Sequence, residues 1–183
     1  MVQVGVTGHR RLVPTEGLER AIDEALGRIA SALSGPLTFV SPLAEGADQL
    51  VVRRAFALGH RRLIVPLPLP KNDYLRTFAS ADAGAELLRL LAQADEVVVM
   101  GQASTDVEAY HAVGRWVLDH ADVLVAVWNG RPPRGKAGTG AIVEEARARG
   151  LPMAWIHADQ GLTRADRLAA SRRREVVVTY ERL

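Results

Sequence analysis

Residues 123–150 read VLVAVWNGRPPRGKAGTGAIVEEARARG. The stretch begins with a continuous apolar run at residues 123–128, passes through a glycine-rich segment, and from Thr139 takes on the composition of a helix. A buried strand followed by a glycine loop and a helix start is the arrangement with which α/β proteins hold phosphate. The stretch therefore predicts an α/β fold and raises the question of whether this chain binds a phosphate.

Further short apolar runs occur along the whole chain, and most of them are continuous rather than alternating with polar residues. Continuous runs are typical of a parallel sheet that is buried on both faces. The predicted strands are residues 2–7, 37–41, 63–66, 96–100, 123–128, 153–157 and 176–180. The predicted helices, which alternate with these strands, are residues 18–33, 47–58, 73–94, 105–120 and 139–149.

Alternation of strands and helices at this pace predicts right-handed crossovers and a Rossmann-like, doubly wound, mostly parallel sheet. We expect six or seven strands in a single domain that spans residues 1–183. Residues 161–183 are rich in arginine and end in a strand-like run, so they are interpreted as a C-terminal extension of one short helix and one edge strand.

Composition excludes several classes of function. The chain has no cysteine, which excludes disulfides, cysteine zinc sites and thiol catalysis. The formal net charge of +2 argues against nucleic-acid binding. The histidines show no metal-ligand spacing, so neither a metal nor a cofactor is expected. No signal peptide and no apolar run of roughly 20 residues is present, and a cytoplasmic location is expected by default.

The predicted strands also indicate where a ligand should bind, because ligands of open α/β sheets lie beyond the carboxyl ends of the strands. Four loops meet this condition, and glycines cluster in them. The candidate ligand-binding residues in these loops are Thr7, Gly8, His9, Arg10, Ser41, Gly46, Ala47, Asn129, Gly130, Gly138, Thr139 and Gly140.

The helix that begins near Thr139 supplies the strongest reason to expect an anion. Free N–H groups and the positive end of the helix dipole face the preceding loop. Thr139 adds a hydroxyl donor, and Arg10 is able to pair with a phosphate or a carboxylate in a bidentate manner. We therefore expect Arg10 and the N–H groups of residues 138–140 to hold a phosphate.

Several of these motifs resemble those of the SLOG superfamily. The similar segments are Thr7-Gly8-His9-Arg10, residues 44–48 (AEGAD), residues 121–130 (ADVLVAVWNG), and Gly138-Thr139 followed by Ala146, Gly150 and Pro152. The superfamily unites the "lonely guy" cytokinin-activating phosphoribohydrolases, the DNA-processing proteins of natural transformation, and nucleotide-sensing domains of bacterial conflict systems. The Thr-Gly-His-Arg loop is most similar to uncharacterised members.

The resemblance implies a Rossmann-like fold, a nucleotide or nucleotide-derived ligand, and a homo-oligomer, but it does not imply one activity. The phosphoribohydrolase branch has a catalytic Glu three residues after the Thr of its Gly-Thr pair. Ile142 occupies that position here, and the nearest acids are Glu144 and Glu145. An Arg-Lys pair of that branch has only Arg115 as an analogue, out of register.

Two acids remain as candidates for a general base if the protein is an enzyme. Glu45 or Asp48 would hold a water near a sugar carbon or stabilise oxocarbenium charge. Glu45 is equally well interpreted as an exposed loop carboxylate, and Asp48 as an acid that favours the first turn of its helix.

The favoured function is therefore the binding of a nucleotide or nucleotide derivative, as a sensor or carrier domain. The alternative is an N-glycosidic hydrolase that acts on nucleoside monophosphates. The third candidate, nucleic-acid binding like that of the DNA-processing proteins, is disfavoured by the charge.

Overall fold

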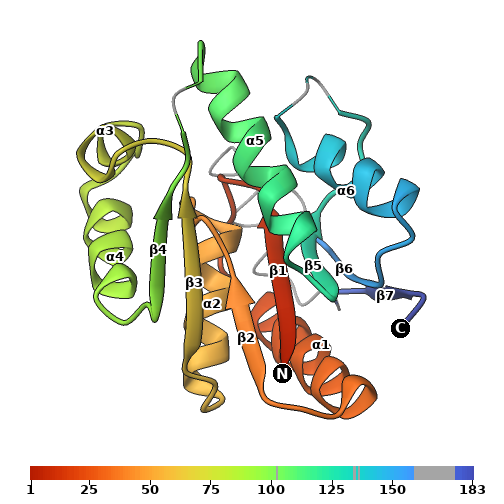
Figure 1. Ribbon diagram of the computed structural model, residues 1–183. Coiled ribbons are helices and arrows are strands. Elements are labelled where there is room, and N and C mark those ends of the chain that lie inside the picture. The colour runs from red at the N-terminus through yellow and green to blue at the C-terminus, as the bar shows by residue number, and fades with distance from the viewer. Residues whose placement is uncertain (102, 134, 136, 159–175) are drawn as a thin grey trace.

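The computed structural model describes residues 1–101, 103–133, 135, 137–158 and 176–183, and they form an α/β fold around one sheet (Figure 1). The strands are β1 (Val2–Gly8), β2 (Leu37–Val40), β3 (Arg62–Leu67), β4 (Glu96–Val99), β5 (Val123–Trp128), β6 (Met153–His157) and β7 (Val178–Glu181). The helices are α1 (Glu16–Leu33), α2 (Ala47–Ala57), α3 (Lys71–Arg76), α4 (Ala81–Leu91), α5 (Asp106–Asp119) and α6 (Thr139–Ala148).

The sheet has the order β4-β3-β2-β1-β5-β6-β7, and every neighbouring pair is parallel except β6 and β7. The chain therefore winds from β1 to one side of the sheet and then, from β5, to the other. This is the doubly wound arrangement that the sequence predicted. The antiparallel edge strand β7 confirms the predicted edge strand, whereas the predicted short helix of the same extension lies outside the described residues.

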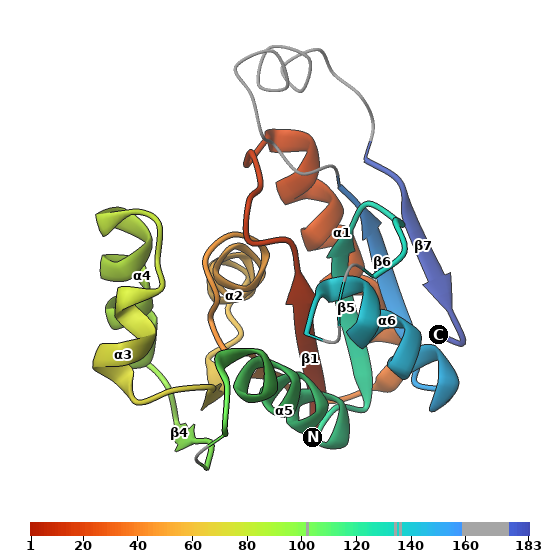
Figure 2. The same cartoon turned by 90° about the horizontal axis from the view of Figure 1, so that it is seen from above.

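Helices cover both faces of the sheet (Figure 2). α1 and α2 pack on one face, where Ile22, Val51, Val4 and Phe39 belong to the larger hydrophobic cluster. α5 and α6 pack on the other face. Because β5 is covered by helices on both faces, all six of its residues are buried, and its sequence is continuously apolar.

The predicted helix at residues 73–94 is wrong, because α3 and α4 are two separate helices. The Thr77 hydroxyl donates to the carbonyl of Tyr74 at 2.8 Å, at the end of α3. The Ser80 hydroxyl accepts the N–H of Ala83 at 3.1 Å and forms the N-cap of α4. Serine at an N-cap stabilises a new helix start, and this signal within an apolar helical pattern was overlooked.

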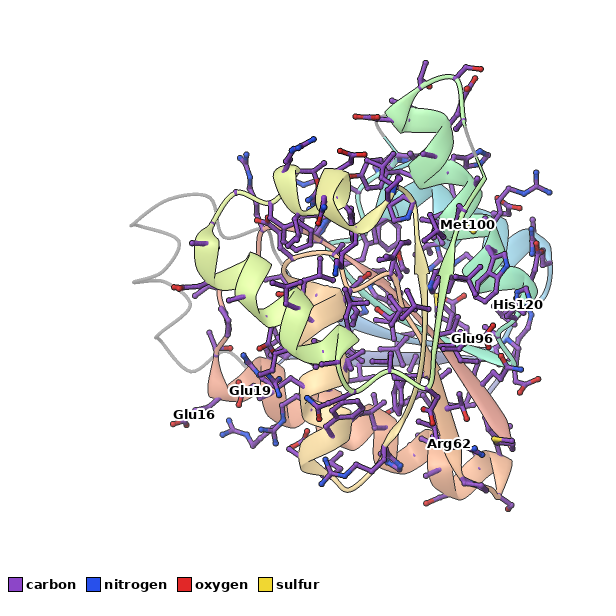
Figure 3. All side chains as sticks on the ribbon, turned by 60° about the vertical axis from the view of Figure 1, so that its left-hand side comes forward. Glu16, Glu19, Arg62, Glu96, Met100 and His120 are labelled. Carbon is purple, nitrogen blue, oxygen red and sulfur yellow. The ribbon has the colours of Figure 1, made fainter. Side chains whose placement is uncertain are left out.

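β4 forms one edge of the sheet, and β7 forms the opposite edge (Figure 3). Glu96 and Met100 are labelled at the beginning of this strand and just beyond its end. None of the described helices is long and apolar enough to cross a membrane.

Candidate functional site

The cavity that we call the main cavity, because of its position rather than its volume, lies at the carboxyl ends of β1 and β5. These strands are neighbours in the sheet, and the connections that leave them run to opposite sides, so they form the topological switch point at which ligands of this fold bind. The cavity has a volume of about 560 Å³. Its walls come from residues 6–11, α2, α3, α5, residues 128–133 and residues 137–142.

Viewed from above the strand ends, α2 and α3 lie on one side of β1, and α6 lies on the other side (Figure 2). The main cavity therefore has two ends of different character. One end is formed by the N-terminus of α6, and the other end by polar side chains of α2 and α3. The loop after β1 lies between them.

His9 joins the elements that surround the cavity. Its Nε2 atom accepts the N–H of Asn129, which follows β5, at 3.1 Å. This hydrogen bond requires the neutral tautomer with the proton on Nδ1. The carbonyl of His9 accepts the N–H of Ala47, the first residue of α2, at 3.0 Å. His9 is also buried and lines the cavity, so these two hydrogen bonds fix the positions of the β1 loop, the start of α2 and the loop after β5 around it.

Eight of the predicted ligand-binding residues line the main cavity. They are Thr7, Gly8, His9, Arg10, Asn129, Gly138, Thr139 and Gly140. The other four do not line it, and one of them, Gly46, lines a second cavity: Ser41, Gly46, Ala47 and Gly130. Gly46 has φ +91°, a conformation that favours glycine, and it packs against the backbone of the β1 loop.

Asp48 is the acid that the fold brings into the main cavity. It lies in the first turn of α2 and is 4% exposed. Its Oδ2 atom accepts the N–H of Ala44 at 3.3 Å, and Ser41 also bonds to the carboxyl group. Burial raises the pKa of Asp48 to about 7, against smaller lowering effects of these hydrogen bonds and of the Arg10 charge. The carboxyl group therefore changes its charge near neutral pH.

Glu45, the other candidate acid, is placed outside the main cavity. Its Oε2 atom accepts the N–H of Ala79 at 2.7 Å and lies 3.9 Å from the Arg10 guanidinium. It lines a second cavity of about 590 Å³, between residues 10–14, α2 and α4. Glu45 thus connects the loop before α2 to the break between α3 and α4. Of the two candidate acids, only Asp48 lines the main cavity.

Arg10 lines both cavities, but its guanidinium is held on the α3 side. The group donates to the carbonyl of Thr77 at 3.2 Å and lies over the rings of Phe78 and Tyr110 at 5.8 and 5.9 Å. Together with the Glu45 contact, these partners place the positive charge near Asp48.

The N-terminus of α6 supplies donors for an anion. Gly138 is the N-cap, and as a glycine it has no side chain with which to cap the helix. The carbonyl of Gly138 accepts the N–H groups of Ala141 and Ile142, whereas those of Thr139 and Gly140 have no acceptor among the described residues. A Cβ atom at Gly138 would meet nothing within 4 Å. As far as the described residues show, the helix therefore has two N–H donors without an acceptor at the main cavity, and there is open space at Gly138.

Ile142 lines the main cavity with an apolar side chain, which can neither donate nor accept a proton. Its side chain packs against Gly114 of α5 and is 4% exposed. The nearby Glu145 does not replace an acid at this position, because it is bound to Arg115 at 3.2 Å and to Arg149 at 2.6 Å. Neither Glu144 nor Glu145 lines the cavity.

Sequence reasoning missed several residues of the main cavity. Tyr74 was interpreted mainly as a helix anchor, whereas Tyr110 and Arg131 were not considered. Tyr74 follows the carboxyl end of β3, where the topological rule does place it near the site, but anchoring of its helix was preferred to contact with a ligand. Tyr110 lies within α5, which crosses over the sheet, and no local pattern marks it. Among the described residues, no group of three or more histidines and acids could hold a metal ion.

Comparison with known proteins identifies neither a family nor a function. No family model and no curated protein matches this sequence. Two chains of solved structures match, and one is the X-ray structure of TM1055, a structural genomics target. That chain is 19% identical, with a TM-score of 0.48 over 84% of this chain and 72% of its own length. At this identity and TM-score, nothing about ligand or activity follows.

Proposed function

We propose that this protein binds a nucleotide or a nucleotide-derived small molecule in the main cavity, as a sensor or carrier domain. The observation that carries the proposal is the N-terminus of α6, which lines a cavity at the topological switch point and whose Thr139 and Gly140 N–H groups have no acceptor among the described residues. The SLOG-like motifs of the sequence agree with a ligand of this class.

The size and the walls of the cavity fit such a ligand. A volume of about 560 Å³ lies within the range of small-molecule sites. The walls combine apolar residues, such as Val113 and Trp128, with a few polar groups. We place the phosphate on the N–H groups and the Thr139 hydroxyl, with Arg131 as the nearby cation, because the Arg10 guanidinium is already bound to Thr77.

A matched pair of substitutions at Gly138 tests this placement. Gly138 has φ −86° and open space around its Cα atom, so both Asp and Asn fit, and both are good N-caps. Gly138→Asp adds a negative charge where the phosphate would bind, and it should weaken phosphate binding at least tenfold. Gly138→Asn is the uncharged control and should weaken it much less.

The ligand would first be identified by saturation-transfer NMR with AMP, an N6-substituted AMP, NAD and ADP-ribose, and its affinity then measured by calorimetry. Equal affinities of the Gly138→Asp and Gly138→Asn variants for the ligand would show that its phosphate does not bind at the N-terminus of α6. If none of these compounds binds the wild-type protein, the proposed function is wrong.

Asp48 supports a second candidate function, the hydrolysis of the N-glycosidic bond of a nucleoside monophosphate. A carboxyl group with a pKa of about 7 in a largely apolar cavity is suited to accept a proton from an attacking water. The water oxygen would bond to the sugar C1, the bond from C1 to the base nitrogen would break, and the base would leave with a proton. Ile142, at the position of the acid in the phosphoribohydrolases, argues against this function.

The hydrolase is tested by the release of free base from AMP and from N6-substituted AMP, followed by chromatography. Asp48→Asn should abolish turnover at saturating substrate, whereas Glu144→Gln, at an exposed residue outside the cavity, should not change it. If the wild-type protein binds these nucleotides and releases no base from them, hydrolysis is excluded and only the binding function remains.

A further inference from the structure

The end of the main cavity opposite α6 contains a buried polar group without a partner. Tyr74 of α3 lines the cavity, and its side chain is 0% exposed. Its hydroxyl oxygen has no hydrogen-bond partner among the described residues. A buried, unpaired hydroxyl is unfavourable, and such a group in a native structure calls for a functional explanation.

Asp48 lies at the same end of the cavity and interacts electrostatically with the Tyr74 hydroxyl. The other charged or titratable groups that act on Tyr74 are Arg10 from the β1 loop, Glu45 from the loop before α2, and Tyr110 from α5. Arg10 is occupied by Thr77 and Glu45, and the Tyr110 hydroxyl donates to Thr77 Oγ1 at 3.1 Å. Tyr74 and Asp48 are therefore the groups left to contact a ligand here.

The chemistry of this end selects a neutral, hydroxylated group. A second phosphate would be repelled by the Asp48 carboxylate, because little solvent screens charges at a buried site. An apolar group would leave the Tyr74 hydroxyl unpaired. A sugar hydroxyl satisfies both side chains, since it donates to a carboxylate and also accepts from a phenol.

We propose that Tyr74 and Asp48 bind the ribose hydroxyls of a ligand whose 5′-phosphate lies on the N-terminus of α6. This inference rests on the proposed function and deepens it, because it makes these two residues the specificity determinants for a ribose 5-phosphate group. The ligand then spans the main cavity from α6 to α2 and α3, with the β1 loop beneath it.

The test measures the binding of inorganic phosphate, ribose 5-phosphate and AMP by ligand-observed ³¹P NMR. Tyr74→Phe removes only the hydroxyl, and we expect the affinity for ribose 5-phosphate and AMP to fall about tenfold, as for one lost hydrogen bond. The affinity for inorganic phosphate should stay unchanged. Tyr180→Phe is the control, because Tyr180 lies on the edge strand β7, away from the cavity.

Asp48→Asn provides the second variant, and it should weaken the same two ligands while leaving inorganic phosphate bound. The unfolding midpoint of each variant gives a further readout. Because Tyr74→Phe removes an unpaired hydroxyl from the interior, the variant should unfold at a higher temperature than the wild-type protein, even though it binds more weakly. Loss of affinity with a gain in stability is a combination that a merely structural role would not produce.

Four outcomes would overturn the inference. In the first, Tyr74→Phe leaves the binding of ribose 5-phosphate and AMP unchanged, while Gly138→Asp still abolishes their binding. The proposed function would then stand, and the inference about the ribose hydroxyls would be wrong. A lower affinity for AMP with an unchanged affinity for ribose 5-phosphate would indicate that Tyr74 contacts the base rather than the ribose. An equal loss for all three ligands would indicate a change in folding. Absence of any binding to the wild-type protein would remove the proposed function as well.

Discussion

Asp48 shows how one residue serves two purposes that the sequence left as alternatives. It lies in the first turn of α2, where an acid is favoured by the helix dipole, and it also lines the main cavity. Its position was predictable, because the topological rule places the loop after β2 at the site. Its burial and pKa were not predictable, because they depend on α3 and α5, which cover this end of the cavity.

The raised pKa of Asp48 predicts a dependence of stability on pH. Its pKa is about 7 in the folded protein and close to its ordinary value of 3.8 in the unfolded chain. The folded state therefore binds the proton more tightly, and as the pH rises from about 4 to about 7 the free energy of unfolding falls. Above pH 7 this contribution is constant.

Asp48→Asn removes this titration and should become more stable relative to the wild-type protein as the pH rises. The relative gain between pH 4 and pH 8 is on the order of a few kcal/mol. Urea denaturation of both proteins at pH 4, 5, 6, 7 and 8 checks the prediction. Parallel stability profiles would show that Asp48 does not titrate in this range.

At the scale of elements, one missed boundary explains the position of Glu45. The sequence pattern at residues 73–94 was interpreted as one helix, whereas the chain breaks at residues 77–80. The break exposes the N–H of Ala79, which Glu45 accepts. Had the helix been continuous, this N–H would have been paired within it, and Glu45 would have lacked this partner. The missed helix boundary thus hid the hydrogen-bond partner of a candidate site residue.

Gly8 is the point at which β1, α2 and β5 meet. A Cβ atom there would overlap the side chain of Ala47 and would lie 2.7 Å from the carbonyl of Val127, where the backbone cannot easily yield. Gly8→Ala should therefore lower the free energy of unfolding by about 1–3 kcal/mol, the usual range for overpacking.

Gly27→Ala is the matched control for this prediction. Gly27 lies in α1, and a Cβ atom there would meet nothing within 4 Å. The same chemical change should raise the free energy of unfolding by about 0.5–1 kcal/mol, because alanine favours a helix interior. Chemical denaturation of both variants should give opposite signs. A neutral Gly8→Ala would mean that the three elements pack less closely than the structure shows.

For the whole molecule, the sequence predicted all seven strands, the parallel sheet and the site at the strand ends. The order of the strands could not be derived from local patterns, because β1 pairs with β5 across more than half of the chain. The order nevertheless determines that the loops after β1 and β5 form the cavity. It also determines which strand is left at the edge, and so where the molecule could associate with a copy of itself.

Self-association, implied by the resemblance to the SLOG superfamily, stays a prediction, and we expect it at β4. Among the described residues this edge strand pairs only with β3, and its side chains Val97 and Val99 are 46% and 51% exposed. Unpaired edge strands with apolar side chains pair readily with another chain, and lysine prevents such pairing. Across a two-fold axis, the same short strand of a second copy could continue the sheet.

Val99→Lys should therefore shift the protein towards the monomer in sedimentation velocity. The substitution should change the free energy of unfolding of the monomer by no more than about 0.5 kcal/mol, because the residue is half exposed. Val107→Lys is the control, because Val107 is similarly exposed but lies on α5 rather than on the edge strand. If the wild-type protein sediments as a monomer at all concentrations, the open edge is already protected and the prediction is wrong. If Val107→Lys dissociates the protein and Val99→Lys does not, the copies meet through α5.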